Sequence, residues 1–136
     1  MTPAVTRLVV ERALDRCEMC RMHQCLQGAT FHVDHLVPLS LGGTSDVENL
    51  AWFCPSCNLH KSNRLVAIDP ETEELVPLFN PRMEGWSEHF RFDGYEIAAM
   101  TATGRATIAA LALNHPRRIR IRLAEEKFGL FPAAET

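Results

Sequence analysis

The sequence predicts an α+β fold, in which a strand hairpin and a short helix form a core between an N-terminal helix and a C-terminal extension. Two Cys-x-x-Cys pairs, at residues 17–20 and 54–57, bracket two short stretches rich in β-branched and aromatic residues. Apolar residues recur at helical spacing near both ends of the chain. A length of 136 residues suits one modest core plus an extension. We therefore expect residues 1–136 to form a single domain.

The first half of the chain predicts a helix followed by a hairpin and a second helix. Residues 3–16 favour a helix, because Pro3 suits a first helical turn and apolar side chains recur every three or four positions. The segments 29–37 (ATFHVDHLV) and 50–54 (LAWFC) predict two strands, joined by a turn-rich segment. Pro55 then opens a short polar helix. The predicted order is strand, strand, helix.

The second half predicts less regular structure before two further helices. Residues 65–90 carry three prolines and few helix signals, so we expect extended chain and turns. Residues 90–100 predict a second hairpin that turns at Asp93-Gly94. Helices are expected over residues 104–114 and 117–129, the second closed by Gly129.

Composition limits the function classes. The formal net charge of −3 argues against a protein that holds nucleic acid by bulk charge alone. No apolar run is long enough to span a bilayer, and the N-terminus lacks the pattern of a signal peptide, so we expect a cytoplasmic protein. In a reducing compartment, five cysteines favour metal ligands or free thiols over disulfides.

The four paired cysteines predict a structural zinc site. Cys17, Cys20, Cys54 and Cys57 offer four thiolates, and each short spacing lets one tight turn supply two ligands. Four buried or redox thiols are the alternative. A shell of four cysteines leaves no open position for substrate, so the metal is expected to be structural. Cys25 and His23 are read as a free thiol and a surface imidazole, although either could substitute as a ligand.

Four polar residues around the hairpin suggest a second, chemical site. Asp34 and His35 precede the hairpin loop, Asn49 opens the second strand, and Asn58 follows the last cysteine. Neighbouring strand residues point to opposite faces, so Asp34 and His35 can share a site only if the strand twists or bulges. Pro38 and Gly42-Gly43 make such a departure plausible. On the helix, Lys61 faces the same way as Asn58, whereas His60 does not.

Residues 17–64 resemble the HNH nucleases, with their ββα-metal fold. The resemblance is carried by CEMC and by HVDHLVPLSLGGTSDVENLAWFCPSCNLHKSNR. His35, Asn49 and Asn58 fall at the family's H, N and H-or-N positions. The later VPLFNPR and TATGRAT segments also resemble the extension of small bacterial HNH proteins, which makes 17–64 the nuclease core and 65–136 the extension.

The resemblance implies hydrolysis of a nucleic-acid phosphodiester at one divalent metal ion. His35 would act as general base on water, and Asp34 and Asn58 would hold Mg²⁺, Mn²⁺ or a similar ion through oxygen. Asn49 would orient His35 from across the loop. A role for His32, which shares a strand face with Asp34, is left open. We expect a monomer or a homodimer. A monomer with one such site would most simply nick double-stranded DNA, whereas cutting both strands would need two sites or two visits.

Basic side chains are candidate contacts to DNA phosphates. They are Lys61, Arg64, Arg117, Arg118, Arg120 and Arg122. The alternative for the last four is a solvated helix face that pairs with Glu125 and Glu126. At the level of the whole protein, the competing hypothesis is a zinc-stabilised module that binds nucleic acid or protein without cutting. A component of a defence or phage system, directed by partner proteins, is a third possibility.

Overall fold

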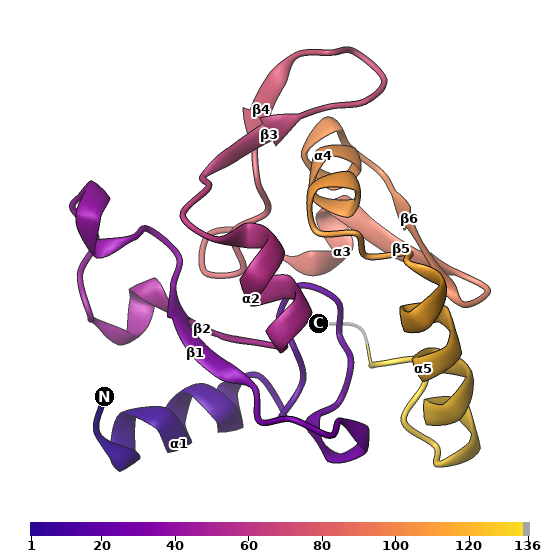
Figure 1. Cartoon of the computed structure of the whole chain (residues 1–136), viewed down its shortest axis with the longest axis horizontal. Coiled ribbons are helices and arrows are strands. Elements are labelled where there is room, and N and C mark those ends of the chain that lie inside the picture. Colours follow the sequence, from indigo (N-terminus) through magenta and orange to yellow (C-terminus); the bar gives the residue numbers. More distant parts are fainter. Residues whose placement is uncertain (135–136) are drawn as a thin grey trace. The chain divides into compact units, whose positions relative to one another are not determined.

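The computed structural model describes residues 1–134, so the last two residues of the expected extension lie outside the described part. The chain forms two compact units, Met1–Asn63 and Arg64–Thr136 (Figure 1). Each described unit combines helices with two-stranded antiparallel sheets. The predicted α+β class is therefore confirmed.

The first unit opens with helix α1, Pro3–Arg12. The Thr2 side chain caps it by accepting a hydrogen bond from the backbone N–H of Val5 at 3.2 Å. The helix is shorter than the predicted range of 3–16. Leu14 and Asp15 adopt φ angles of 56° and 55°, a left-handed conformation that ends an α-helix and turns the chain toward the first cysteine pair.

The predicted hairpin is confirmed, with shorter strands than expected. Strand β1, His32–His35, pairs antiparallel with β2, Leu50–Phe53, so that His35 lies opposite Leu50. Every residue of β2 is buried, which makes this strand the centre of the first unit's core. Short 3₁₀ turns lie at Gln24–Leu26, Leu39–Leu41 and Val47–Asn49.

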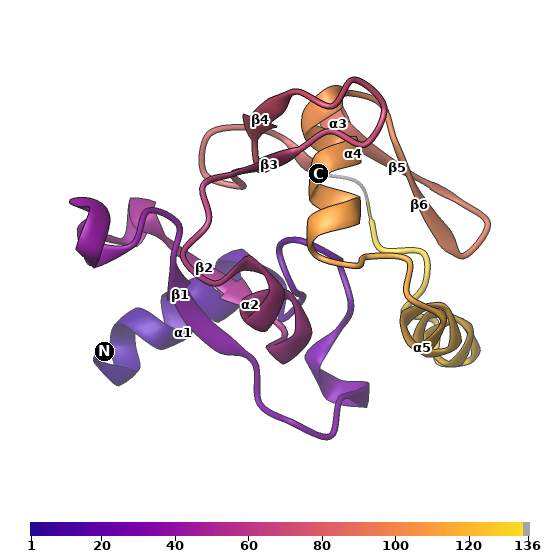
Figure 2. The ribbon, with the colours of Figure 1, turned by 45° about the horizontal axis from the view of Figure 1, so that its top comes forward.

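Helix α2, Pro55–Lys61, follows β2 and packs beside β1 (Figure 2). The helix begins at Pro55, as predicted. Proline lacks an N–H group, and a first-turn N–H would have no partner within the helix. The sulfur of Cys54 caps the N-terminal end by accepting a hydrogen bond from the Cys57 N–H. The helix stops at Ser62, whose φ is 50°. The order strand, strand, helix is thus the one that the sequence predicts.

The second unit is more regular at its start than the prolines suggested. Strands β3, Val66–Ile68, and β4, Leu75–Pro77, form a hairpin, and a short helix α3 spans Trp86–His89. The hairpin loop is built around Asp69, whose N–H donates to the carbonyl of Glu74 at 2.9 Å. One aspartate holds this loop in place. Such a contact produces no periodic pattern in the sequence, so the hairpin was not predicted.

The second half of this unit follows the predicted order with shifted boundaries. Strands β5, Phe90–Asp93, and β6, Glu96–Ala99, pair so that Gly94 and Tyr95 form the turn, one residue later than predicted. Helix α4 spans Ala102–Ala110 and helix α5 spans Pro116–Lys127. Helix α4 ends earlier than expected, because Ala112 adopts a φ of 50°.

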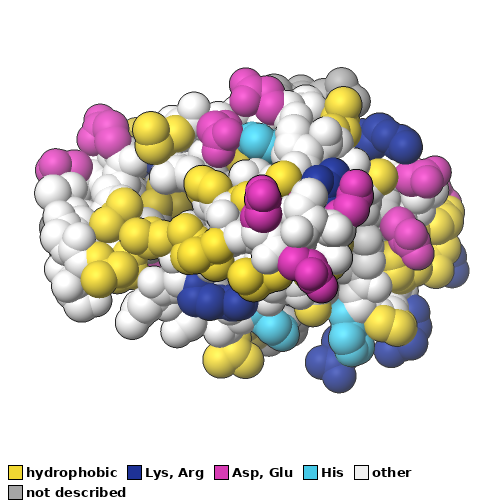
Figure 3. All heavy atoms as spheres, turned by 90° about the horizontal axis from the view of Figure 1, so that it is seen from above, with side chains coloured by type: hydrophobic (Ala, Val, Ile, Leu, Met, Phe, Trp, Pro, Cys, Tyr) yellow, Lys and Arg dark blue, Asp and Glu magenta, His cyan; other side chains and the backbone are white. Residues whose placement is uncertain are grey.

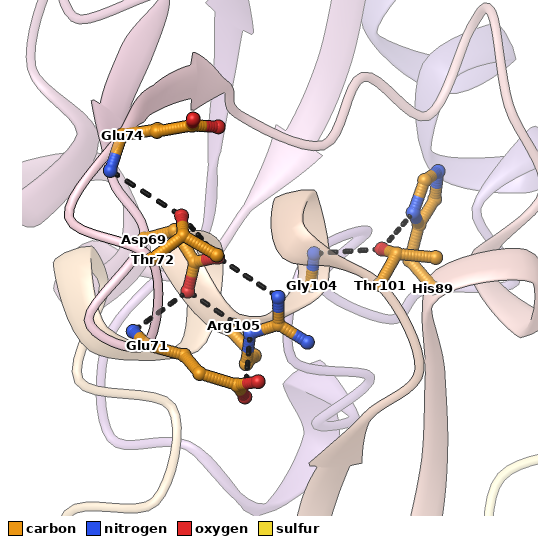
Figure 4. A network of polar contacts seen from close by, with 8 residues as sticks. All are labelled: Asp69, Glu71, Thr72, Glu74, His89, Thr101, Gly104 and Arg105. Atoms are coloured by element: carbon orange, nitrogen blue, oxygen red, sulfur yellow. Dashed lines mark hydrogen bonds and ion pairs between the residues drawn. The ribbon is translucent and has the colours of Figure 1, made fainter.

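A polar network ties the β3–β4 loop to α4 (Figure 4). The fully buried Asp69 accepts two hydrogen bonds from Arg105, from Nε at 2.9 Å and from Nη2 at 2.8 Å. Its carboxylate also accepts from the Glu71 N–H at 3.0 Å and the Thr72 hydroxyl at 2.9 Å. Every Asp69 oxygen is therefore satisfied, as a buried carboxylate requires.

Figure 3 draws Asp and Glu side chains interspersed with hydrophobic side chains on the surface. The exposed hydrophobic side chains of the second unit include Val66, Ile68 and Leu75 of the β3–β4 hairpin. Over residues 1–134, no helix has the length and apolar character needed to cross a membrane.

Candidate metal centre and active site

The four paired cysteines converge on one point. The sulfur atoms of Cys17, Cys20, Cys54 and Cys57 all lie within 4.8 Å of one another, and all four residues are buried. The Sγ atoms of Cys20 and Cys54 are 3.8 Å apart, too far for a disulfide. Tetrahedral zinc with Zn–S bonds of about 2.3 Å would separate its sulfurs by about 3.8 Å. The tetrad therefore has the spacing of a four-thiolate zinc site.

Local backbone geometry delivers these sulfurs in pairs. The Cys17 N–H donates to the Met22 carbonyl at 2.9 Å, and the Cys17 carbonyl accepts from the Arg21 N–H. These two hydrogen bonds close a tight turn in which Arg21 has a φ of 67°. Cys54 caps α2, so Cys57 lies one helical turn away. Burial is the main cause that raises the pKa of Cys17 and of Cys57 well above the ordinary value. Such thiols ionise only with a cation beside them.

Glu18, which the sequence analysis did not single out, joins the first cysteine turn to β2. Its carboxylate accepts from the Trp52 N–H at 2.8 Å, and its own N–H donates to the Trp52 carbonyl at 2.9 Å. Glu18 is 5% exposed. Glu18 thus pairs with Trp52 as a residue of a neighbouring strand would, although it belongs to no strand. Sequence spacing does not predict such a contact.

Asn49 is the organising residue of the β1–β2 loop. Its side chain accepts from the Val37 N–H at 2.9 Å and donates to the carbonyls of Val37 at 3.0 Å and Thr44 at 2.7 Å. Three hydrogen bonds from one amide fix the two ends of the loop relative to each other. These hydrogen bonds span the hairpin loop, and the role of Asn49 in orienting His35 stays a prediction.

Gly43 is required by the same arrangement. A Cβ atom at this position would lie 1.8 Å from the Val37 carbonyl oxygen and 3.0 Å from Nδ2 of Asn49. Gly42 precedes it with a φ of +90°, a conformation that side chains disfavour. The Gly-Gly pair therefore lets the loop close against the main chain that leaves β1.

Asp34 and His35 lie at the end of β1, before this loop. The pairing register from His32 to His35 is unbroken, so the strand contains no bulge of the kind considered from the sequence. Instead, Oδ1 of Asp34 accepts a hydrogen bond from the His35 N–H at 2.8 Å. Nε2 of His35 lies 3.0 Å from Oγ of Ser45, a loop residue that sequence reasoning missed. Both Asp34 and His35 are partly exposed.

Helix α2 contributes Asn58 and Lys61 on the side that packs beside β1. Asn58 is partly buried, and its side-chain amide has no hydrogen-bond partner among residues 1–134. Lys61 is only 3% exposed, and its Nζ donates to the Leu36 carbonyl at 3.2 Å. Burial lowers the pKa of Lys61, and the Asp34 carboxylate opposes this shift.

The burial of Lys61 corrects its predicted contact with phosphate. Its ammonium group holds the end of β1 to α2, which leaves it little surface for a ligand. His60 is exposed on α2, and its Nδ1 lies 2.7 Å from the Ser56 carbonyl one turn earlier. His32 and Cys25 are exposed as well.

The predicted arginine cluster divides into two pairs. Arg118 and Arg122 are 3% and 1% exposed, and each donates Nη2 to a main-chain carbonyl, of Leu111 at 2.8 Å and of Leu113 at 2.6 Å. These two side chains hold α5 to the segment before it, so we remove them from the candidate phosphate contacts.

The other candidate contacts are exposed. Arg117 and Arg120 lie on the surface of α5. Arg64 is also exposed, and it donates to the Ala110 carbonyl at 3.1 Å.

The hairpin, the helix packed on it and the buried cysteine tetrad define a small ββα arrangement whose four thiols are positioned for a metal ion. Residues 17–64 match the family model described as HNH endonuclease. The match falls on the segment where the sequence resemblance places the HNH pattern. Searches among curated proteins and among solved structures found no match.

Proposed function

We propose that the HNH domain is a metal-dependent endonuclease that hydrolyses DNA phosphodiester bonds. The observation that carries the proposal is the convergence of Asp34 and His35, at the end of β1, with the helix that bears Asn58. Lys61 and Leu36 join these two elements directly. A base and oxygen ligands for a cation are what phosphodiester hydrolysis needs.

His35 is the proposed general base. A neutral imidazole can take a proton from water near physiological pH. The Ser45 hydroxyl lies beside Nε2, so Nδ1 is the ring nitrogen left to accept the proton. In this tautomer Nε2 carries the ring hydrogen and donates a hydrogen bond to Oγ of Ser45. Asn49 keeps the loop that carries Ser45 in place.

Asp34 and Asn58 are the proposed ligands of a divalent cation such as Mg²⁺ or Mn²⁺. One carboxylate and one amide oxygen match the preference of such hard ions for oxygen, and the Asn58 amide has no other partner in the described part of the chain. A cation bound there would stabilise negative charge on the leaving oxygen. The remaining coordination positions would be filled by water and the scissile phosphate.

The cysteine tetrad is proposed to bind zinc for structure alone. Its four sulfurs complete a tetrahedral shell and leave no position for substrate. We further propose that the protein works in the cytoplasm, a reducing compartment in which four clustered thiols can serve as metal ligands.

Exposed arginines of the extension are proposed to contact the DNA backbone. The candidates are Arg117 and Arg120 of α5 and Arg64, which are exposed, whereas Lys61, Arg118 and Arg122 are buried. We propose that residues 65–136 act with the HNH core as one functional protein, which nicks one DNA strand because the matched segment 17–64 offers one such site. Its oligomeric state and any partner proteins of a defence or phage system would decide double-strand cleavage.

Cleavage of supercoiled plasmid tests the proposal. Wild-type protein with Mg²⁺ or Mn²⁺ should produce nicked circles. EDTA should stop the reaction, and added Mg²⁺ should restore it. The zinc content is measured in parallel, so that loss of the catalytic ion is distinguished from loss of zinc. His35→Ala should lower the rate by about 10²-fold or more. His60→Ala, which removes an exposed histidine of α2, is the matched control and should cleave normally. Absence of metal-dependent nicking, or equal nicking by His35→Ala, would favour the non-catalytic binding module.

A further inference from the structure

We propose that Arg12, on α1 and outside the matched segment, is a positioning residue for His35. Its effect on catalysis rests on the proposed nuclease function, whereas its effect on the histidine ring does not. Three consecutive sets of hydrogen bonds, all within the first unit, connect the two residues. Arg12 would therefore make α1 part of the working site and not only of the fold.

The first set joins Arg12 to the main chain around Asn49. Nη1 donates to the Val47 carbonyl at 2.9 Å, and Nη2 donates to the Leu50 carbonyl at 2.6 Å. These carbonyls lie on either side of Asn49, so one guanidinium group spans that residue. Because the group is planar and rigid, it fixes the distance between its two acceptors.

The second set joins Asn49 to the chain around Ser45. Nδ2 of Asn49 donates to the Thr44 carbonyl at 2.7 Å, and the Asn49 N–H donates to the Asp46 carbonyl at 2.8 Å. Ser45 lies between these two acceptors. Asn49 thus holds Ser45 from both sides, as Arg12 holds Asn49.

The third set reaches His35 in two ways. Oγ of Ser45 lies 3.0 Å from Nε2 of the ring, and the Asn49 carbonyl accepts from the N–H of Leu36, the residue after His35, at 2.9 Å. The position of the His35 ring and that of the main chain next to it therefore both depend on Asn49. Loss of Arg12 would loosen the segment 45–50, and with it the orientation of the ring.

Arg12 could instead serve only to dock α1 on β2, and Val9 provides the control for that possibility. Val9 is fully buried on the same helix. Val9→Ala should therefore weaken the docking of α1, and it removes none of the groups that form the hydrogen bonds around Asn49. Arg12→Met removes both donors but keeps an unbranched apolar stem. Comparison at matched loss of thermal stability separates the two roles.

Steady-state cleavage gives the first readout. At a temperature where both variants are folded, Arg12→Met should lower kcat by about tenfold with KM changed by less than about twofold, as expected for loss of a residue that orients a catalytic group. Val9→Ala should retain the wild-type kcat. Equal kcat in the two variants would overturn the proposal.

A double variant gives the second readout. If Arg12 and Ser45 act through one path, Arg12→Met combined with Ser45→Ala should cost no more than the worse single change. Multiplication of the two losses would show independent action and would contradict the proposal.

A spectroscopic measurement tests the positioning without any cleavage. Well above the usual imidazole pKa, long-range ¹H–¹⁵N spectra report which ring nitrogen of His35 carries the hydrogen. Wild type and Val9→Ala should show two distinct nitrogens, with Nε2 protonated, whereas Arg12→Met and Ser45→Ala should shift both signals toward tautomer averaging. If wild type never cleaves DNA but these shifts occur, the positioning stands and only the nuclease proposal fails. Unchanged His35 signals in Arg12→Met would refute the positioning.

Discussion

The side chain of Asn49 and the backbone of Val37 form a reciprocal pair: Oδ1 accepts from the Val37 N–H at 2.9 Å, and Nδ2 donates to the Val37 carbonyl at 3.0 Å. This pair closes the β1–β2 loop one residue after Leu36, whose N–H donates to the Asn49 carbonyl just beyond the ends of the two strands. The loop geometry that places Ser45 beside His35 depends on it.

Replacement of Asn49 should therefore affect catalysis more than folding. Asn49→Ala removes three side-chain hydrogen bonds and should lower kcat for plasmid nicking by about 10- to 100-fold. Asn49→Asp keeps the acceptor for Val37 but cannot donate to Thr44, so it should be similarly impaired. Full activity in Asn49→Asp would show that the donated bonds are dispensable.

Removal of the structural metal should unfold the first unit. Cys57→Ser removes one of four buried ligands and should abolish stoichiometric zinc, because the binding free energy of such sites is also folding free energy. Zinc content and circular dichroism measure the two effects. Cys25→Ser changes an exposed cysteine outside the tetrad and should retain the metal. Loss of zinc in both variants would contradict the assignment.

Gly43 should be intolerant of any side chain. Gly43→Ala places a methyl group on the Val37 carbonyl oxygen, which should cost about 1–3 kcal/mol and slow cleavage. Gly28→Ala is the matched control, since nothing lies within 4 Å of its added Cβ. Thermal melting of both variants checks the prediction. Equal melting temperatures would mean that the loop relaxes at no cost.

The Asp69–Arg105 pair should make the second unit sensitive to acid. Hydrogen bonds from Arg105, helped by those from Glu71 and Thr72, hold the pKa of Asp69 well below its ordinary value. A depressed pKa gives stability that is complete above the unfolded-state pKa of about 3.9 and is lost as the pH falls below it.

Melting temperature measured from neutral pH down to about pH 2 tests this linkage. Asp69→Asn should be less stable than wild type at neutral pH, and the difference should narrow in acid. Glu71→Gln, whose side chain is 69% exposed, should follow the wild-type profile closely. A constant difference between wild type and Asp69→Asn at every pH would exclude the ionised pair as its source.

Arg117 and Arg120 should act through the DNA backbone. Changing either to Ala should weaken binding to all duplex sequences alike and reduce the slope of log affinity against log salt by about 0.9. Arg7→Ala removes an exposed arginine of α1 that has no proposed DNA contact, and it should leave the slope unchanged. Salt titrations of duplex binding without divalent metal measure the slopes. An unchanged slope in both α5 variants would remove this helix from the interface.

The cysteine tetrad and the hairpin were predictable because their signals are local. A Cys-x-x-Cys pair needs only one tight turn, and alternating β-branched residues need only a neighbouring strand. The family resemblance then located Asp34, His35, Asn49 and Asn58 within one segment. Strand ends and helix ends were less predictable, because single left-handed residues such as Leu14 and Ala112 set them.

The fates of individual charged residues could not be predicted in this way. Lys61 and Arg122 carry the charge that favours phosphate, yet each is buried and donates to a carbonyl of its own unit. Whether a cation meets solvent or main chain depends on which backbone groups remain unpaired nearby. That information exists only after the segments have packed.

The amino-acid sequence by itself determined the α+β class, the cysteine tetrad and the segment that carries the candidate chemistry, since each depends on residue types at short spacings. Only the tertiary structure decided that Ser45 faces His35, that Arg12 spans Asn49, and that half of the arginine cluster is internal. These relationships join residues up to 38 positions apart through main-chain carbonyls. Every residue offers the same main-chain carbonyl, whatever its side chain. No sequence pattern therefore marks which carbonyl will accept a hydrogen bond from a distant side chain.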